Sequence, residues 1–263
     1  MYKLGIVGLG KMGGAILTGI LNSKVLDKKD IYLSLYEDNI ARYKDSGIPY
    51  TLDALDVFKN CEMVLLSIKP QQFDEALKGV ENIDFEGRGI LSIAAGITIS
   101  YLESKFKNAD IIRAMPNTPA LINMAVITYA SNNFESKYVS LAEKIFGSIG
   151  SFYKINENQM DATLALNGSM PAYIDLFIKA FIDKAVKDGI NYETAKGLTV
   201  ESIIASCNLV LKSDDDIDTL IKNVCSKGGT TIAGLDKLYE NNFVKAIEEC
   251  SEACKNRSKE LAK

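Results

Sequence analysis

The 263-residue sequence predicts an α/β protein in which a parallel sheet wrapped by helices is followed by an all-helical region. Up to about residue 155, short apolar segments alternate with segments in which the apolar residues have helical spacing. From Asn158 onward, only the helical spacing remains. This change of period predicts two domains, residues 1–156 and residues 157–263.

Short apolar runs bounded by polar or turn residues predict the strands of the sheet. They are Lys3–Val7, Ile31–Leu35, Met63–Ile68, Ile90–Ala94, Ile111–Ala114, Val126–Ala130 and Ser151–Ile155. In the second domain, the spacing predicts helices at Asp161–Lys187, Glu193–Leu211, Ile217–Val224, Ile232–Asn241 and Val244–Lys259. The segment Gly168-Ser169-Met170-Pro171 should interrupt the first of these, because a proline disfavours helical backbone in the residue before it.

A glycine-rich turn follows the first predicted strand at once. It reads Gly8-Leu9-Gly10-Lys11-Met12-Gly13, and apolar residues at helical spacing come directly after it. This strand–turn–helix context is the one that a dinucleotide-binding fingerprint requires. Gly8 permits the tight turn, Gly10 lets a pyrophosphate approach the backbone, and Gly13 lets helix and strand pack closely. The motif therefore predicts a Rossmann-type nucleotide-binding domain.

Three later strands end in segments that lie where an open α/β sheet places its ligands. They are Ser67-Ile68-Lys69-Pro70-Gln71, Ala94-Ala95-Gly96 and Arg113-Ala114-Met115-Pro116-Asn117-Thr118-Pro119. The two prolines around Asn117 and Thr118 stiffen the third segment, which suits preorganised hydrogen bonding to a ligand. The alternatives are an ordinary surface role for Lys69 and purely structural turns at the prolines.

The helical region contains a second glycine motif, Ser226-Lys227-Gly228-Gly229-Thr230-Thr231. Adjacent glycines let consecutive N–H groups point at one spot, which makes a nest for an anion. Ile232 and Leu235 continue at helical spacing, so the loop opens a helix whose positive end faces the same spot. The alternative is a helix cap preceded by a flexible turn.

Composition narrows the class of protein. The net charge of −4 argues against a nucleic-acid partner, and no apolar run approaches the roughly 18 residues of a membrane span. The odd number of cysteines, without a CxxC pair or a preceding signal peptide, favours reduced thiols in the cytoplasm. The sequence has no histidine, which excludes an imidazole base and any histidine-ligated metal site. We therefore expect a cytoplasmic protein without a metal.

Together these motifs resemble the pyrroline-5-carboxylate reductase family, in the family's order and over essentially the whole chain. Gly168-Ser169, followed by Pro171-Ala172-Tyr173, belongs to the same pattern. The resemblance implies hydride transfer from NADPH or NADH to the C=N carbon of 1-pyrroline-5-carboxylate, giving L-proline in the last step of proline biosynthesis. It also implies a homodimer formed through the helical domain, which assembles further into an oligomer such as a decamer.

The resemblance implies a role for each motif. Thr231 is the catalytic residue, in contact with the ring nitrogen of the substrate. The substrate-binding residues are Ser226, Gly228, Gly229, Thr230 and Asn117. The cofactor-binding residues are Gly8, Leu9, Gly10, Lys11, Met12, Gly13, Ser34, Leu35, Ser67, Ile68, Lys69, Pro70, Ala94, Ala95 and Gly96. A protonated imine is already a good electrophile, so this chemistry is mostly positioning and needs no histidine.

The chain departs from the family pattern at several positions. Lys227 stands where the family usually has proline, and Asn167 and Met170 stand in a segment that usually reads Ser-Gly-Ser-Gly-Pro. Both departures bear on the shape of the pocket. Leu35-Tyr36 replaces an Asn-Arg pair that meets the NADPH phosphate in many relatives.

The residues after the second strand bear on the choice of cofactor. Glu37-Asp38 can accept hydrogen bonds from free ribose hydroxyls, whereas Arg42 lies one turn into the next helix and favours a phosphate. We expect use of both NADH and NADPH.

Two alternatives remain. A β-hydroxyacid dehydrogenase also joins a GxGxxG domain to a helical one, but it uses a lysine followed one turn later by an asparagine. Here Lys179 and Lys184 are followed by aspartates. A non-catalytic nucleotide-binding regulator is the other alternative, and loss of Thr231 or Gly228 would have signalled it.

The helical domain carries apolar stripes that a monomer would expose. They comprise Ile174, Phe177, Ile178, Phe181, Ile182, Ile203, Ile204 and Leu209. A patch of this size predicts an obligate dimer formed through the C-terminal domain.

Overall fold

The computed structural model describes residues 1–261, and the side chains of Glu37, Asp38 and Leu261 lie outside this description. The chain forms two compact units. The first comprises Met1–Pro171 together with the residues from Ala253 onward, and the second comprises Ala172–Glu252.

Within the described residues, the first unit contains an eight-stranded sheet with the order β3-β2-β1-β4-β5-β6-β7-β8. The strands are β1 (Tyr2–Val7), β2 (Ile31–Ser34), β3 (Tyr50–Thr51), β4 (Cys61–Leu66), β5 (Gly89–Ser92), β6 (Asp110–Met115), β7 (Ala125–Ser131) and β8 (Gly150–Lys154). Every strand predicted from the sequence is present, with ends that shift by one or two residues. The short β3 was not predicted, because two residues carry no periodicity.

Two strands, β7 and β8, run opposite to the other six. β7 pairs antiparallel with β6, whereas the remaining neighbours are parallel. The sheet is therefore mainly parallel, as predicted, and the direction of the strands reverses at β7 and β8. The connection 116–124 is shorter than the dozen or more residues that a parallel crossover needs, so the chain turns back.

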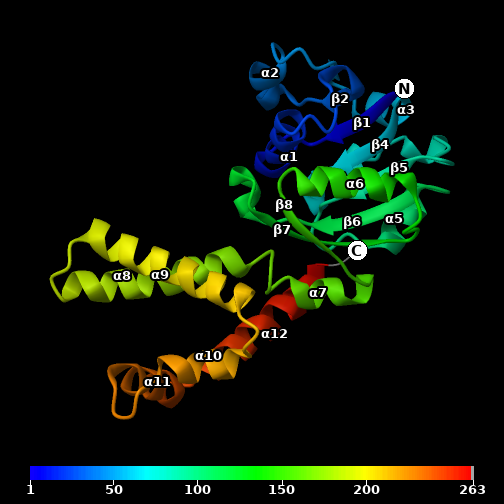
Figure 1. Cartoon of the computed structure of the whole chain (residues 1–263). Coiled ribbons are helices and arrows are strands. Elements are labelled where there is room, and N and C mark those ends of the chain that lie inside the picture. Colours follow the sequence, from blue (N-terminus) through cyan, green and yellow to red (C-terminus); the bar gives the residue numbers. More distant parts are fainter. Residues whose placement is uncertain (262–263) are drawn as a thin grey trace. The chain divides into compact units, whose positions relative to one another are not determined.

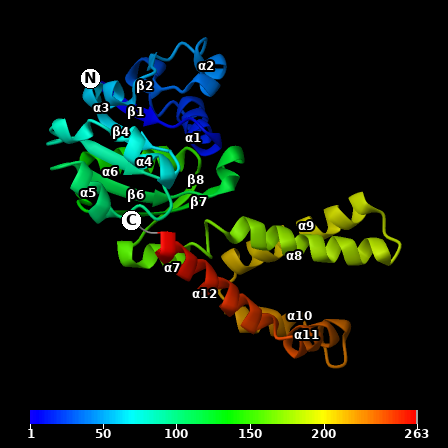
Figure 2. The same ribbon diagram turned by 180° about the vertical axis from the view of Figure 1, so that it is seen from behind.

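Helices cover both faces of the sheet. They are α1 (Lys11–Asn22), α2 (Glu37–Tyr43), α3 (Ala54–Asn60), α4 (Phe73–Ala76), α5 (Ile99–Lys105), α6 (Lys137–Gly147) and α7 (Met160–Thr163), with 3-10 turns η1 (Lys28–Asp30), η2 (Pro70–Gln72), η3 (Val80–Asn82), η4 (Thr118–Ile122) and η5 (Glu157–Gln159). Figure 1 shows α6 across one face, and Figure 2 shows α4 across the other. Ile6 packs into the core beneath α1 and α6, whereas Val7 packs into the core beneath α3, α4 and α5. Strands buried on both faces explain why their sequences are continuously apolar.

The second unit is helical, as predicted. Its elements are α8 (Met170–Lys187), α9 (Tyr192–Lys212), α10 (Ile217–Val224), α11 (Thr230–Glu240) and α12 (Phe243–Leu261). The predicted interruption is confirmed, since α7 ends at Thr163 and α8 begins beside Pro171. α8 begins and α12 ends in the first unit, where Ser258 Oγ donates to Asp161 Oδ1 at 2.7 Å. None of the helices in residues 1–261 combines the length and apolarity that crossing a membrane requires.

α8 and α9 lie side by side in both views of the molecule (Figures 1 and 2). Phe181, Leu198, Ile204 and Leu209 on these helices are all exposed. The second unit thus presents apolar faces that nothing in the single chain covers within the described residues.

Candidate functional site

The glycine turn after β1 has the geometry that its sequence requires. Gly8 has a φ of +96°, and a Cβ there would stand 2.4 Å from the carbonyl oxygen of Ser67. A Cβ on Gly13 would stand 2.3 Å from the carbonyl oxygen of Gly8. Around Gly10, by contrast, no described atom lies within 4 Å of the Cβ position. The backbone at Gly10 is therefore open to a ligand at the start of α1.

The residues after four strands, β1, β4, β5 and β6, surround one cavity of about 310 Å³. The cavity is lined by Gly10, Lys11, Met12, Ser67, Ile68, Lys69, Pro70, Ile93, Ala94, Ala95 and Pro116. Gly10 caps α1 without a side-chain partner, so the N–H groups of the first turn are available to an anion. Lys11 and Lys69 add positive charge beside this turn. The site fits the pyrophosphate of a dinucleotide.

Other predicted cofactor residues are absent from the lining of the cavity. Leu9 and Gly13 are buried beneath the turn, and Gly96 takes a φ of +75° in the turn after β5. Ser34 and Leu35 at the end of β2 are each 1% exposed, so their side chains face the interior of the unit. The sequence identified these positions as part of the motif, and the structure separates turn-forming residues from cavity-lining ones.

The end of β2 carries the residues that bear on cofactor choice. Tyr36 is 45% exposed, and burial of its remaining surface, with Glu75 nearby, raises the pKa of its hydroxyl. The guanidinium of Arg42 lies over the Tyr43 ring, 5.2 Å from its centroid. The predicted role of Glu37 and Asp38 concerns side chains outside the described residues.

The loop after β6 is held by Asn117. Its Oδ1 accepts a hydrogen bond from the N–H of Val126 at 2.9 Å, and its Nδ2 donates to the carbonyl of Asn167 at 3.1 Å. The Asn117 side chain thus ties this loop to neighbouring backbone, whereas Pro116 beside it reaches the cavity. A substrate contact by Asn117 stays a prediction.

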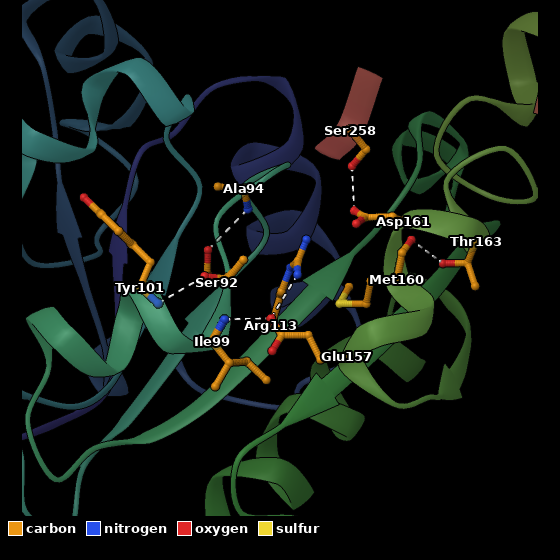
Figure 3. A network of polar contacts seen from close by, with 11 residues as sticks. Ser92, Ala94, Ile99, Tyr101, Arg113, Glu157, Met160, Asp161, Thr163 and Ser258 are labelled. Carbon is orange, nitrogen blue, oxygen red and sulfur yellow. Dashed lines mark hydrogen bonds and ion pairs between the residues drawn. The ribbon is translucent and has the colours of Figure 1, made fainter. Parts of the chain in front are cut away.

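A partly buried ion pair links β6 to η5 (Figure 3). Nη1 of Arg113 donates to Oε1 of Glu157 at 2.9 Å, and the N–H of Ile99 donates to the same oxygen at 2.7 Å. Nearby, the hydroxyl of Ser92 accepts from the N–H of Ala94 at 3.3 Å. Sequence reasoning found Arg113 but missed Glu157, because a lone acidic residue 44 positions away carries no local signal.

The second glycine motif forms an open helix start in the second unit. Gly228 has a φ of +71°, and the N–H of Gly229 donates to the carbonyl of Ser226 at 2.9 Å. Gly229 caps α11 without a side-chain partner. A Cβ on Gly229 would stand 2.4 Å from Ser226 Oγ, so only glycine leaves room for that hydroxyl. The structure therefore brings together Ser226 and Gly228–Thr231 at the start of α11, where the Gly229 N–H is paired within the turn.

Family models match both parts of the chain. Residues 157–261 match the model described as pyrroline-5-carboxylate reductase dimerisation. Residues 3–96 match the model described as NADP oxidoreductase, coenzyme F420-dependent.

Whole-chain relatives have the same name. The pyrroline-5-carboxylate reductase of Staphylococcus aureus is 32% identical over 265 residues, covering 99% of this chain and 98% of its own. The solved reductase of Plasmodium falciparum, with NADP bound, superposes with a TM-score of 0.89 at 31% identity, over 100% of this chain and 98% of its own. The Coxiella burnetii reductase superposes with a TM-score of 0.88 at 29% identity, over 100% of this chain and 99% of its own. The chain therefore belongs to the pyrroline-5-carboxylate reductase family.

Proposed function

We propose that the protein reduces 1-pyrroline-5-carboxylate to L-proline with NADPH or NADH. The observation that carries the proposal is the start of α11 at Thr230, which has no side-chain cap, in a chain that matches such reductases along its whole length. The substrate is a small cyclic imine with one carboxylate. A helix N-terminus with free N–H groups is a suitable site for that carboxylate.

The residues at the start of α11 have two roles, binding the carboxylate and contacting the ring nitrogen. The N–H groups of Gly228 and Thr230, with the hydroxyl of Ser226, bind the carboxylate. The N–H of Gly229, which the sequence also predicted as a carboxylate contact, is already paired with the Ser226 carbonyl and fixes the turn instead. Thr231, in the first turn of α11, places its hydroxyl at the ring nitrogen. When hydride adds to the C=N carbon of the protonated imine, the π electrons of that bond move to nitrogen and neutralise its charge. The protein therefore orients the reactants and supplies no strong acid or base.

The cavity of the first unit fits the cofactor, whose reduced nicotinamide supplies the hydride when it is bound. The N–H groups at the start of α1, beside Lys11 and Lys69, hold the pyrophosphate. Ala94, Ala95 and Pro116 also line this cavity. Their small or rigid side chains suit a flat ring and exclude water from it.

The assembly that we propose is a homodimer formed through the second unit, which associates further into an oligomer such as a decamer. Support comes from an apolar hollow of about 540 Å³ between α8 and α9, lined by Phe177, Phe181, Leu198 and Ile203 among others. A surface of this kind is stable when a second apolar surface covers it. We place the enzyme in the cytoplasm, which agrees with the free thiols of all five cysteines.

The deciding experiment is turnover of 1-pyrroline-5-carboxylate, followed at 340 nm with NADPH and with NADH. We expect proline as the product with both cofactors. A matched assay with β-hydroxy acids and the oxidised cofactors tests the dehydrogenase alternative. Nucleotide binding without turnover of either substrate class would support a non-catalytic regulator and overturn the proposal.

A further inference from the structure

Asn167 is a buried polar hub between α7 and α8, only 2% exposed. Its Nδ2 donates to the carbonyl of Met115 at 2.8 Å and to Oγ1 of Thr128 at 3.3 Å. Its Oδ1 accepts from the N–H of Gly168 at 2.6 Å, and its main-chain carbonyl accepts from Asn117 Nδ2 at 3.1 Å. Both amide protons of Asn167 are thus used, as burial of an amide demands.

These contacts hold the segment Met115–Asn117 at both ends. Asn167 binds Met115 through its side chain and Asn117 through its main chain. Pro116, between them, lines the cavity and has no N–H of its own with which to anchor itself. The position of the Pro116 ring therefore depends on its two neighbours, and through them on Asn167.

The strand order shows which end of a dinucleotide meets Pro116. The pyrophosphate belongs at the start of α1, after β1, and the adenosine ribose belongs at the end of β2. β2 flanks β1 on one side, whereas β4, β5 and β6 follow on the other. Ala94 and Pro116 come after β5 and β6, so they lie at the opposite end of the cofactor from the adenosine. That end carries the nicotinamide.

We propose that Asn167 is a positioning residue for the nicotinamide ring, which acts by setting Pro116 and does not itself touch the cofactor. The inference rests on the proposed use of NADPH or NADH. It predicts that loss of the Asn167 amide weakens binding of the nicotinamide end alone. If Asn167 had only a structural role, its loss would weaken the binding of every part of the cofactor equally, or of no part.

The test is calorimetric titration of wild type and Asn167→Ala with NADPH and with 2′-phospho-ADP-ribose, which lacks the nicotinamide. We expect the Kd of NADPH to rise about tenfold in the variant, the scale of one lost positioning contact, with the fragment's Kd changed less than about twofold. Equal weakening of both ligands overturns the proposal, as does no weakening of NADPH. Wild type that binds NADPH no more tightly than the fragment also overturns it.

Ser136→Ala is the matched control for lost stability. Ser136 is buried at the start of α6, where its hydroxyl accepts from the N–H of Tyr138 at 3.1 Å. The same hydroxyl donates at 2.6 Å to Oδ2 of Asp110, which begins β6 at the opposite end of that strand from Pro116. Substitution of Ser136 should lower the Tm and leave the ratio of the two Kd values unchanged. A change of that ratio equal to the one in Asn167→Ala overturns the proposal.

A second variant keeps the test decisive if Asn167→Ala does not fold. Thr128→Val removes one partner of Asn167 with little change in shape. It should raise the Kd of NADPH by a few-fold and leave that of the fragment unchanged, and the absence of this difference overturns the proposal. These titrations contain no pyrroline-5-carboxylate, so an enzyme that binds as expected but does not turn over would contradict the proposed function alone.

Discussion

Arg113 and Glu157 form an ion pair at 2.9 Å that ties the end of β6 to η5, and the arginine side chain is only 5% exposed. Replacing Glu157 with glutamine leaves a buried guanidinium without its counter-charge. Hydrogen bonds to charged groups contribute about 1.5–3 kcal/mol, so Glu157→Gln should lower the free energy of unfolding by about that amount. Chemical denaturation of both proteins measures the difference.

An exposed ion pair provides the control for this prediction. Lys179 and Asp183 are paired one turn apart on α8, and both side chains are at least half exposed. Because water screens such pairs, Asp183→Asn should change the free energy of unfolding by less than about 0.5 kcal/mol. If Glu157→Gln and Asp183→Asn lowered the free energy of unfolding equally, burial of Arg113 would not explain the loss.

The catalytic assignment makes a second prediction. Thr231→Ala should lower kcat by about 10²-fold or more, because the hydroxyl acts on the reacting nitrogen, and should leave nucleotide affinity nearly unchanged. Steady-state kinetics and NADPH titration measure the two effects. Thr194→Ala, in the first turn of α9, is the matched control and should keep wild-type turnover. Wild-type turnover in Thr231→Ala would show that the assignment is wrong.

The carboxylate contact makes a third prediction. Ser226→Ala should raise the KM for pyrroline-5-carboxylate by about tenfold with kcat little changed, because the contact exists before and during the reaction. Initial rates over a range of substrate concentration separate the two constants. Ser213→Ala, in the loop between α9 and α10, is the control. A fall in kcat without a rise in KM would move Ser226 from binding to catalysis.

Sequence reasoning predicted the elements better than the contacts between them. Periodicity and glycine motifs are local, so the strands, the helices and both glycine turns at helix starts could be predicted from them. The direction of β7 depends on the length of one connection, and β3 is too short to have a period. Glu157 and Asn167 were missed as site residues because each acts on a strand 44 or more residues away. The hydrogen-bond partners of Glu157 and Asn167 are determined by tertiary packing and leave no local pattern in the sequence.

Assembly provides a fourth prediction. Leu198 is 60% exposed and lines the hollow between α8 and α9, so we expect wild type to scatter light as a dimer or a larger even multiple of the chain. Leu198→Glu puts a charge into that apolar surface and should shift the protein toward monomers at micromolar concentration. Leu52→Glu, at a site 62% exposed in the first unit, is the matched control and should leave the oligomeric state unchanged. A monodisperse wild-type monomer would contradict the proposed dimer.

The last prediction concerns the choice between NADPH and NADH. Tyr36, at the end of β2, offers no cation to a 2′-phosphate. Nη2 of Arg42 lies 3.6 Å from the position that a Cβ on Gly14 would take, and its guanidinium packs on the Tyr43 ring. We therefore expect kcat/KM values for the two cofactors within about tenfold of each other in wild type. Tyr36→Arg supplies a charged partner for the phosphate and should shift the ratio toward NADPH by about tenfold or more.

The control for added charge is Tyr50→Arg, on β3, where the tyrosine is also partly exposed. It should leave the ratio of kcat/KM for NADPH and NADH unchanged, because β3 lies beyond β2 at the edge of the sheet. If wild type already prefers NADPH a hundredfold, a cation other than residue 36 meets the phosphate. Arg42→Ala would then abolish that preference if Arg42 is the cation, and the predicted role of Glu37 and Asp38 in accepting NADH would be wrong.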